Sequence, residues 1–384
     1  MDAPMENLCG KLRDVVNSTN IFYEDVKEKV NYDVICAMMD RVDESMDYII
    51  THPDIPKNND EQLLLLNHVC IVADVIKCLF GRLGLEYNSL ERHLPKFLDC
   101  VCYNPPFNLA PEQIPSDDSV VEYIRSISFA HPLETNRGHL IRQIHDEHCS
   151  PFLMLNRALC DVEHIGVYVY STHSHKSFPI QFPYKGLRSY VYARYGLIAY
   201  IIDELERRKQ NKEDIWRTRT VNRDLGEPGL ILDDVLSIMT ERYQSTYDVA
   251  MLKSLLTYQY TNHKNDAAVA QVQQVALSAI PEICNAIDEM DNDKLYDALE
   301  KVLYIRPKNM HQMAYYQLEK IFAYLNDRVS PSDKHWGLMQ ADEFSKEFAK
   351  NWVEIDVATM DCEEIKLLTT IACFLEAQKQ NQGA

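Results

Sequence analysis

The apolar positions of the N-terminal third recur every three or four residues, which is the period of an amphipathic α-helix. One such pattern spans residues 18–53, opens with cap-type residues and stops at a proline. A second starts around Asp60 and Glu61, whose charges suit the positive end of a helix dipole, and ends near Gly81 or Gly84. Because only a short polar turn separates the two patterns, we expect an antiparallel helical hairpin.

Two shorter helices are expected downstream. Residues 90–102 carry a helical pattern interrupted by a proline, and the proline-rich residues 103–118 that follow are not helical. The pattern resumes behind a capping residue at 116–118 and ends at Pro132, because a residue that precedes proline is pushed out of helical geometry. The stretch RSISFAHP, residues 125–132, is therefore expected on the last turns of this helix.

The pattern changes after residue 150. The segments HIGVYVYST and SFPIQFPY are rich in β-branched and aromatic residues, are separated by the polar residues HSHK, and predict a two-stranded β-hairpin. A helical segment rich in basic and aromatic residues follows. From residue 224 to the end the period is helical again, and breaks are expected near Pro281, Pro307 and Pro331.

These patterns predict a mainly α fold with three parts: an N-terminal helical bundle, a small central β-hairpin with a basic and aromatic helix, and a C-terminal helical region. We expect the parts to span residues 1–150, 151–223 and 224–384. The length of 384 residues agrees with this division, because it exceeds the usual size of a single core. A content of only 11 glycines disfavours a turn-rich all-β architecture.

Net charge limits the classes of partner. The formal charge of −19 repels polyanions and disfavours nonspecific binding to nucleic acid or to an anionic membrane, so any RNA site must be local. Residues 224–384 contribute −12 of this charge, from 26 acidic and 14 basic side chains. This acidic C-terminal region offers a surface for a protein partner.

The apolar and cysteine-bearing segments favour a soluble protein of the cytoplasm. The longest apolar run, residues 63–80, is interrupted by polar and charged side chains and falls short of the roughly 18 uninterrupted apolar residues of a membrane span. The N-terminal residues lack the basic start and apolar core of a secretory signal. The 11 cysteines lie mostly in apolar stretches, as reduced thiols do, and no disulfide framework is expected.

Arg125 and His131 carry the chemistry that the sequence suggests most directly. An arginine holds a phosphate through paired hydrogen bonds, and a histidine moves protons near neutral pH. Together they suit cleavage of RNA by its own 2′-hydroxyl, which needs a base, an acid and a cation but no metal. At a helix C-terminus the dipole favours the protonated imidazole, which suits a proton donor. A second imidazole would come from a two-fold dimer.

The spacing of this pair is not distinctive, but its context is. A histidine that follows an arginine after four to six intervening residues also occurs at Arg142 with His148, Arg157 with His164, Arg306 with His311 and Arg328 with His335. Only the first pair combines a polar residue directly after the arginine, an apolar helix before it, FAHP closing it and a long antiparallel helix pair upstream. That combination, over residues 20–150, resembles the HEPN superfamily of helical, nucleotide-binding domains.

The resemblance implies a metal-independent endoribonuclease, often dimeric and often a toxin or phage-defence effector, with Arg125, Ser126 and His131 at the active site. The family more commonly has Asn, Asp or His at the position of Ser126, and it includes members that are not nucleases. In the alternative interpretation Arg125 pairs with a carboxylate such as Glu134 and His131 caps the helix. The protein would then be a non-catalytic helical scaffold for dimerisation or protein binding.

The basic and aromatic segment is the candidate surface for RNA. Its arginines and lysines form a local excess of positive charge, and its tyrosines could stack on unpaired bases. The candidate RNA-binding residues are Lys185, Arg188, Tyr190, Tyr192, Arg194, Arg207, Arg208, Arg217 and Arg219. In the alternative interpretation these charges pair with the acidic C-terminal region.

The remaining histidines give a weaker signal. His145 and His148 are three residues apart and could share a helical face, although a solvated helix end is the preferred interpretation. His173 and His175 are expected in the hairpin turn. We find no Gly-rich phosphate loop and no hydrolase or kinase motif, and we expect neither a metal nor a cofactor.

Overall fold

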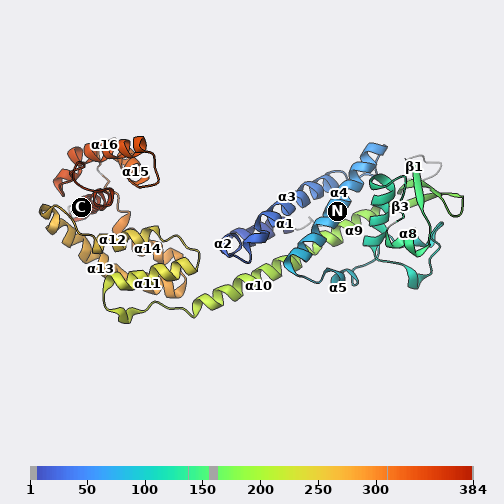
Figure 1. Cartoon of the computed structure of the whole chain (residues 1–384), viewed down its shortest axis with the longest axis horizontal. Helices are drawn as coiled ribbons and strands as arrows, with labels where there is room; N and C mark the ends of the chain where they lie inside the picture. The colour runs from blue at the N-terminus through green and yellow to red at the C-terminus, as the bar shows by residue number, and fades with distance from the viewer. Residues whose placement is uncertain (1–6, 137, 155–162, 309, 383–384) are drawn as a thin grey trace. The chain divides into compact units, whose positions relative to one another are not determined.

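The computed structural model describes residues 7–136, 138–154, 163–308 and 310–382 (Figure 1). The described chain is mainly α-helical with one small antiparallel sheet, which confirms the predicted fold class. It divides into two compact units, Met1–Gln210 and Asn211–Ala384, and each unit has its own hydrophobic core. We call them the first and the second unit.

The first unit opens with four helices: α1 (Leu8–Asn17), α2 (Ile21–Glu24), α3 (Lys29–Thr51) and α4 (Asn59–Leu83). The single helix expected over residues 18–53 is wrong, because the chain leaves helical geometry between α2 and α3. There the side chain of Asp25 accepts a hydrogen bond from the N–H of Lys27 over 2.9 Å, a local turn that competes with the helix. The predicted hairpin is confirmed by α3 and α4, which pack side by side (Figure 1).

Helix α4 is the central helix of the first core. It ends at Gly84, whose φ of +71° is the left-handed geometry of a glycine cap. Among the described helices, α4 is the one that is long and apolar enough to cross a membrane, judged by length and composition. Its apolar side chains, however, contact α3, α7 (Asp117–Arg125) and α9 (Tyr184–Gly196) inside the unit. This packing accounts for its apolar character, and a soluble, cytoplasmic protein stays a prediction.

The segment between α4 and the sheet is only partly helical. The helix expected over residues 90–102 is reduced to α5 (Tyr87–Glu91) and α6 (Cys100–Tyr103), because the intervening chain contains Pro95. A short 3₁₀ turn, η1 (Pro111–Gln113), precedes α7. A π-helical turn, η2 (Ser126–Ala130), and helix α8 (His139–Gln143) follow α7.

The sheet has three antiparallel strands in the order β1 (His148–Met154), β2 (His164–Ser171), β3 (Ser177–Pro183). Strands β2 and β3 form the predicted hairpin, with Val167 opposite Ile180, and His173 and His175 lie in its turn as expected. Strand β1 was not predicted. The buried side chains of β2 and β3 alternate along each strand, so one face of the hairpin belongs to the first core.

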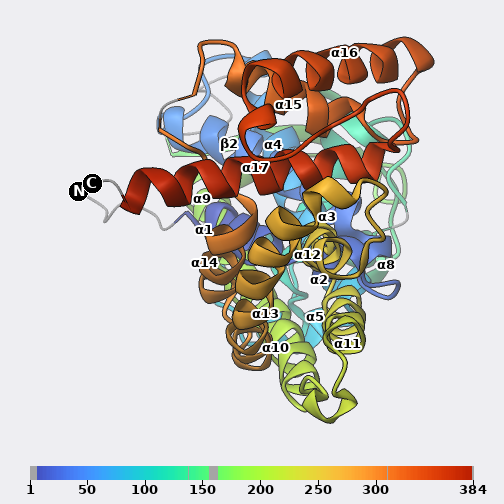
Figure 2. The same cartoon turned by 90° about the vertical axis from the view of Figure 1, so that its left-hand side faces the viewer.

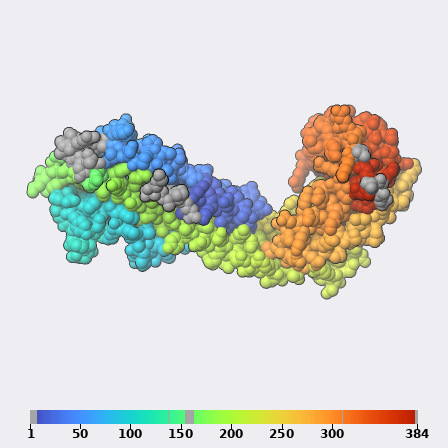
Figure 3. Space-filling model, turned by 180° about the vertical axis from the view of Figure 1, so that it is seen from behind, coloured from blue at the N-terminus to red at the C-terminus, as the bar shows by residue number. Residues whose placement is uncertain are grey.

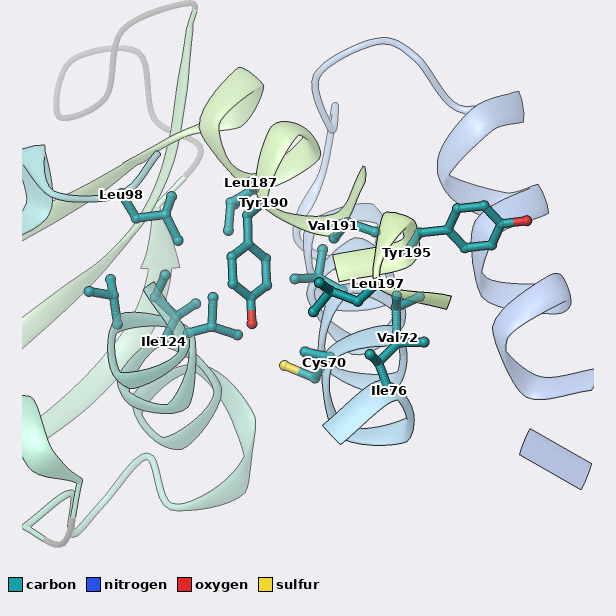
Figure 4. Close-up of a cluster of buried hydrophobic side chains, with 14 of the residues drawn as sticks. Cys70, Val72, Ile76, Leu98, Ile124, Leu187, Tyr190, Val191, Tyr195 and Leu197 are labelled. Carbon is teal, nitrogen blue, oxygen red and sulfur yellow. The ribbon is translucent and has the colours of Figure 1, made fainter. Parts of the chain in front are cut away.

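Helix α9 joins the sheet to the helical part of the first unit, and α10 (Ile198–Arg217) follows it. Tyr190 of α9 points between α4 and α7, and Val191 packs over α4 (Figure 4). The N-terminal helices also lie directly against α10, which is visible at the surface in Figure 3. Residues 151–223 therefore do not form a part of their own, because β2, β3 and α9 share one core with residues 8–150.

The second unit is entirely helical in the part that the structure describes. Its α-helices are α11 (Pro228–Glu241), α12 (Tyr247–Thr257), α13 (Asp266–Glu289), α14 (Asn292–Leu303), α15 (Ala314–Tyr324), α16 (Pro331–Glu347) and α17 (Cys362–Gln382), and its 3₁₀ turns are η3 (Arg223–Leu225), η4 (His263–Asn265) and η5 (Ala349–Asn351). Helix α17 lies between the α15–α16 pair and helices α12–α14 (Figure 2). The predicted breaks at Pro307 and Pro331 are confirmed, whereas Pro281 lies inside α13, which continues through it.

Candidate functional site

The predicted motif lies at the end of α7. Arg125 is the last residue of this helix, and the next five residues form the π-helical turn η2, in which the N–H of His131 donates to the carbonyl of Ser126 over 2.8 Å. The helical geometry ends before Pro132, as predicted. A single π-turn widens the helix and reorients the side chains that follow it, and such turns are frequent at functional sites.

Arg125 forms an ion pair on the surface of the first unit. Its Nη1 donates to Oδ2 of Asp74 over 2.6 Å, and 47% of its side chain and 60% of that of Asp74 are exposed. The partner is therefore Asp74 on α4 and not Glu134, the carboxylate that the sequence suggested. An ion pair this exposed contributes only about 0–1 kcal/mol, so a phosphate group could displace the carboxylate.

A polar pocket of about 370 Å³ adjoins this ion pair. Asp74 and Lys77 of α4 line this pocket together with Arg125 of α7. Glu122, which lies one helical turn before Arg125, also lines it. The carboxylate of Glu122 is exposed and has no hydrogen-bond partner among the described residues. These neighbours of Arg125 were not predicted, although Asp74 and Lys77 are the charges that interrupt the apolar run of α4.

Ser126 and His131 differ in their exposure. The hydroxyl of the half-buried Ser126 donates to Oγ1 of Thr135 over 3.2 Å, and that oxygen in turn donates to the carbonyl of His131 over 2.7 Å. The side chain of Ser126 thus fixes the backbone of the turn. The imidazole of His131 is exposed and makes no hydrogen bond or ion pair with a described residue. His131 does not line the pocket beside Arg125.

A buried hydrogen-bond network lies behind the motif. His148 is fully buried on β1, where its Nδ1 lies 2.8 Å from the hydroxyl of Tyr123 and its Nε2 lies 3.3 Å from Oδ2 of Asp146. Ser171 also donates to Asp146, over 2.6 Å. The expectation that His145 and His148 share a helical face is wrong, because His148 belongs to a strand. His145 is exposed just after the end of α8, as expected of a solvated helix end.

Burial and hydrogen bonding perturb two pKa values in this network. Burial lowers the pKa of His148, and the carboxylate of Asp146 opposes this shift. Burial also raises the pKa of Asp146, but hydrogen bonds from Ser171 and from backbone N–H groups outweigh it and hold the value below the ordinary one. The network therefore favours a neutral His148 beside an ionised Asp146, which is a structural arrangement.

The aromatic part of the candidate RNA surface is largely internal. Tyr190 and Arg194 on α9 are 0% and 1% exposed, and Tyr190 points between α7 and α4 (Figure 4). Both donate to Oδ1 of Asp118, over 2.7 Å from the tyrosine hydroxyl and 2.9 Å from the arginine Nε. These two side chains cannot stack on RNA bases, because the core covers them.

Arg188 has a structural partner as well. Its Nη1 donates to the carbonyls of Ile49 over 2.6 Å and His52 over 3.2 Å, and so caps the C-terminus of α3. Its guanidinium lies over the ring of Tyr192, 5.4 Å from the centroid. Lys185 is exposed and has no partner among the described residues.

The four remaining arginines of the predicted surface are paired with carboxylates. In the first unit Arg207 donates to Glu204 over 2.8 Å, and Arg208 bonds to Glu204 over 2.8 Å and to Glu28 over 3.1 Å. In the second unit Arg217 pairs with Asp214 over 2.8 Å and Arg219 with Asp234 over 2.6 Å. Of these four arginines, Arg219 alone pairs with a carboxylate of residues 224–384. The alternative interpretation, pairing with the acidic C-terminal region, is therefore wrong for the other three, whose carboxylates lie between residues 28 and 214.

The described residues contain no group of three or more His, Cys, Asp or Glu side chains placed to hold a metal ion. The ten described cysteines are free thiols. Burial raises the pKa of Cys70 and of Cys102 to about 12, so these thiols are neutral packing residues.

Comparisons with known proteins assign no relative. No protein-family model, no curated protein and no solved structure matches the chain.

Proposed function

We propose that the first unit is a metal-independent endoribonuclease of HEPN type that acts as a homodimer in the cytoplasm, as a toxin or in defence against phage. The supporting observation is the solvent-exposed imidazole of His131, which follows a π-turn at the end of the helix that carries Arg125. An imidazole in water is free to meet a phosphodiester. The half-exposed guanidinium of Arg125 is held only by a surface ion pair.

The reaction follows from these groups. The 2′-hydroxyl oxygen of RNA attacks the adjacent phosphorus while a base accepts its proton, and the P–O5′ bond breaks as an acid protonates the leaving oxygen. The products are a 2′,3′-cyclic phosphate and a 5′-hydroxyl. His131 supplies the acid, the imidazole of the second copy supplies the base, and Arg125 stabilises the charge on the phosphoryl oxygens. Ser126 holds the turn in place through Thr135.

RNA cleavage in the presence of EDTA tests this proposal. The full chain should cut a mixed-sequence RNA and leave cyclic phosphate ends, and His131→Ala should lower the rate by about 10²–10⁴-fold. His335→Ala is the matched control, because His335 is also exposed and follows Arg328 at a similar spacing, seven residues instead of six. Equal cleavage by wild type and His131→Ala would refute the assignment.

A non-catalytic helical scaffold is the second candidate. It is favoured by the internal partners of Arg125 and Ser126, which are Asp74 and Thr135. A scaffold would form a dimer in sedimentation analysis without cutting or binding RNA. Absence of cleavage by the wild-type chain over a range of RNA substrates would therefore leave this function in place of the nuclease.

A further inference from the structure

The second unit contains an apolar pocket that the proposed nuclease does not use. Its volume is about 210 Å³. Helix α12 contributes Tyr247 and Met251, the segment after α14 contributes Tyr304 and Arg306, and α15 and α17 contribute Leu318 and Cys373. Helices α12, α14 and α15 each contact α17, which lies at the centre of this group (Figure 2).

The size and lining of the pocket suit one aromatic ring. A dry cavity of about 150 Å³ is enough to bind benzene, so this pocket holds a ring with a small substituent. Met251, Leu318 and Cys373 are at most 9% exposed and form its inner wall. Tyr247 and Tyr304 stand at its rim with 52% and 36% exposure. The hydroxyl of Tyr304 donates to Asp248, which fixes the orientation of that ring.

The charge at the rim selects an anion. Arg306 is exposed, and no carboxylate among the described residues pairs with its guanidinium, which lies 5.9 Å from the ring centroid of Tyr315. The other charged residue of the lining, Glu319, is paired with Lys320 over 2.7 Å. An arginine without a counter-ion is conspicuous in a region with 26 acidic and 14 basic residues. A guanidinium binds a carboxylate through two parallel hydrogen bonds.

The influence of Arg306 extends to the inner wall. Burial raises the pKa of the Cys373 thiol to about 12, and the positive charge of Arg306 opposes this shift. Because Arg306 lines the same pocket as Met251, Leu318 and Cys373, one small molecule can contact both the guanidinium and the apolar floor.

We propose that this pocket binds a small aromatic carboxylate, with the ring against Met251 and Leu318 and the carboxylate on Arg306. Small-molecule sites have this composition, a mainly apolar lining with a few polar groups that fix orientation. The site is independent of Arg125 and His131.

Titration of the full chain with three probes of similar size tests the proposal. Phenylacetate carries the anion, phenylacetamide has the same shape without charge, and phenethylamine carries a cation. Calorimetry should show phenylacetate binding about tenfold more tightly than phenylacetamide, because only the carboxylate can form a bidentate ion pair with the guanidinium. Phenethylamine should bind most weakly. Equal affinity for the anion and the cation, or no binding of any probe at millimolar concentration, would overturn the proposal.

Two variants locate the site. Arg306→Gln should remove the preference for phenylacetate and leave phenylacetamide binding unchanged, and the exposed Arg328→Gln in the same unit is its control. Cys373→Phe fills the inner wall and should abolish the binding of both probes. Arg306→Gln changes an exposed side chain and so keeps the fold, even if Cys373→Phe does not. A carboxylate preference that survives in Arg306→Gln would place the anion elsewhere and contradict the assignment.

Discussion

The buried ion pair of Arg194 and Asp118 gives the sharpest test of how the first unit is held together. Asp118 accepts hydrogen bonds from the hydroxyls of Tyr87 over 2.8 Å and Tyr190 over 2.7 Å, and from Nε and Nη2 of Arg194 over 2.9 and 2.7 Å. The side chain of Arg194 is 1% exposed, and the next carboxylate, Glu91, lies 3.6 Å from it. Asp118→Asn keeps the shape of the network but removes the charge that neutralises a buried guanidinium.

The expected cost follows from that burial. Breaking a buried pair by removing one partner typically costs about 3–5 kcal/mol, and the proximity of Glu91 places this case near the lower end, at about 3 kcal/mol. Since domains unfold with about 5–15 kcal/mol, the loss is a large share of the stability of the first unit. The double variant Asp118→Asn with Arg194→Met should recover part of it, because neither charge is then buried.

Urea unfolding of the full chain, combined with hydrogen exchange of α9 by mass spectrometry, measures this loss and assigns it to the first unit. Asp74→Asn is the control, because it breaks the exposed pair with Arg125 and should cost less than about 1 kcal/mol. If Arg194 instead faced RNA, Asp118→Asn would leave stability unchanged and raise RNA affinity. A cost for Asp118→Asn as small as that of Asp74→Asn would refute the structural role.

Three further predictions concern protonation, the motif and a helix end. Because burial lowers the pKa of His148, the folded unit holds it neutral while the unfolded chain takes up a proton below about pH 6.5. The urea midpoint should therefore fall as the pH decreases from about 7 to 5, and His148→Asn should reduce that dependence. Asp74→Asn should tighten RNA binding several-fold in a filter-binding assay, because the carboxylate no longer competes with phosphate for Arg125; unchanged binding would argue against this arginine as a phosphate ligand. Arg188→Met should lower stability by about 1–2 kcal/mol in thermal denaturation without changing RNA affinity, because it removes two hydrogen bonds that cap α3.

Local patterns were sufficient where an element depends on its own residues. Helix α4 combines an unbroken apolar period, acidic residues at its start and a glycine cap, and the β2–β3 hairpin combines two short apolar segments with a polar turn. Both were predicted for these reasons. The turn between α2 and α3 was missed because it depends on hydrogen bonds to the side chain and carbonyl of Asp25, which helical periodicity does not reveal.

Elements and side chains that depend on distant partners were not predictable. Strand β1 pairs with β2, and its His148 is oriented by Tyr123, which lies 25 residues earlier in the chain. The sequence shows that Arg194 is positively charged. It does not show that Asp118, 76 residues away, pairs with this arginine inside the core and neutralises its charge. A charged segment in an acidic protein is therefore as compatible with internal pairing as with a phosphate surface until the fold places its counter-charges.

Exposure separates the arginine–histidine pairs that spacing alone cannot distinguish. His148 is buried against Tyr123, and His311 is half-buried with its Nε2 2.8 Å from Gln317, so neither imidazole is free to meet a substrate. The pair of Arg157 and His164 lies partly outside the described residues. His131 and His335 are exposed, and the arginine that precedes His131 borders a polar pocket of the first unit. Cleavage of a phosphodiester requires an imidazole that is accessible from water and a guanidinium that can leave its carboxylate, and a weak surface ion pair allows the latter. For that reason the nuclease proposal depends on Arg125 and His131 alone.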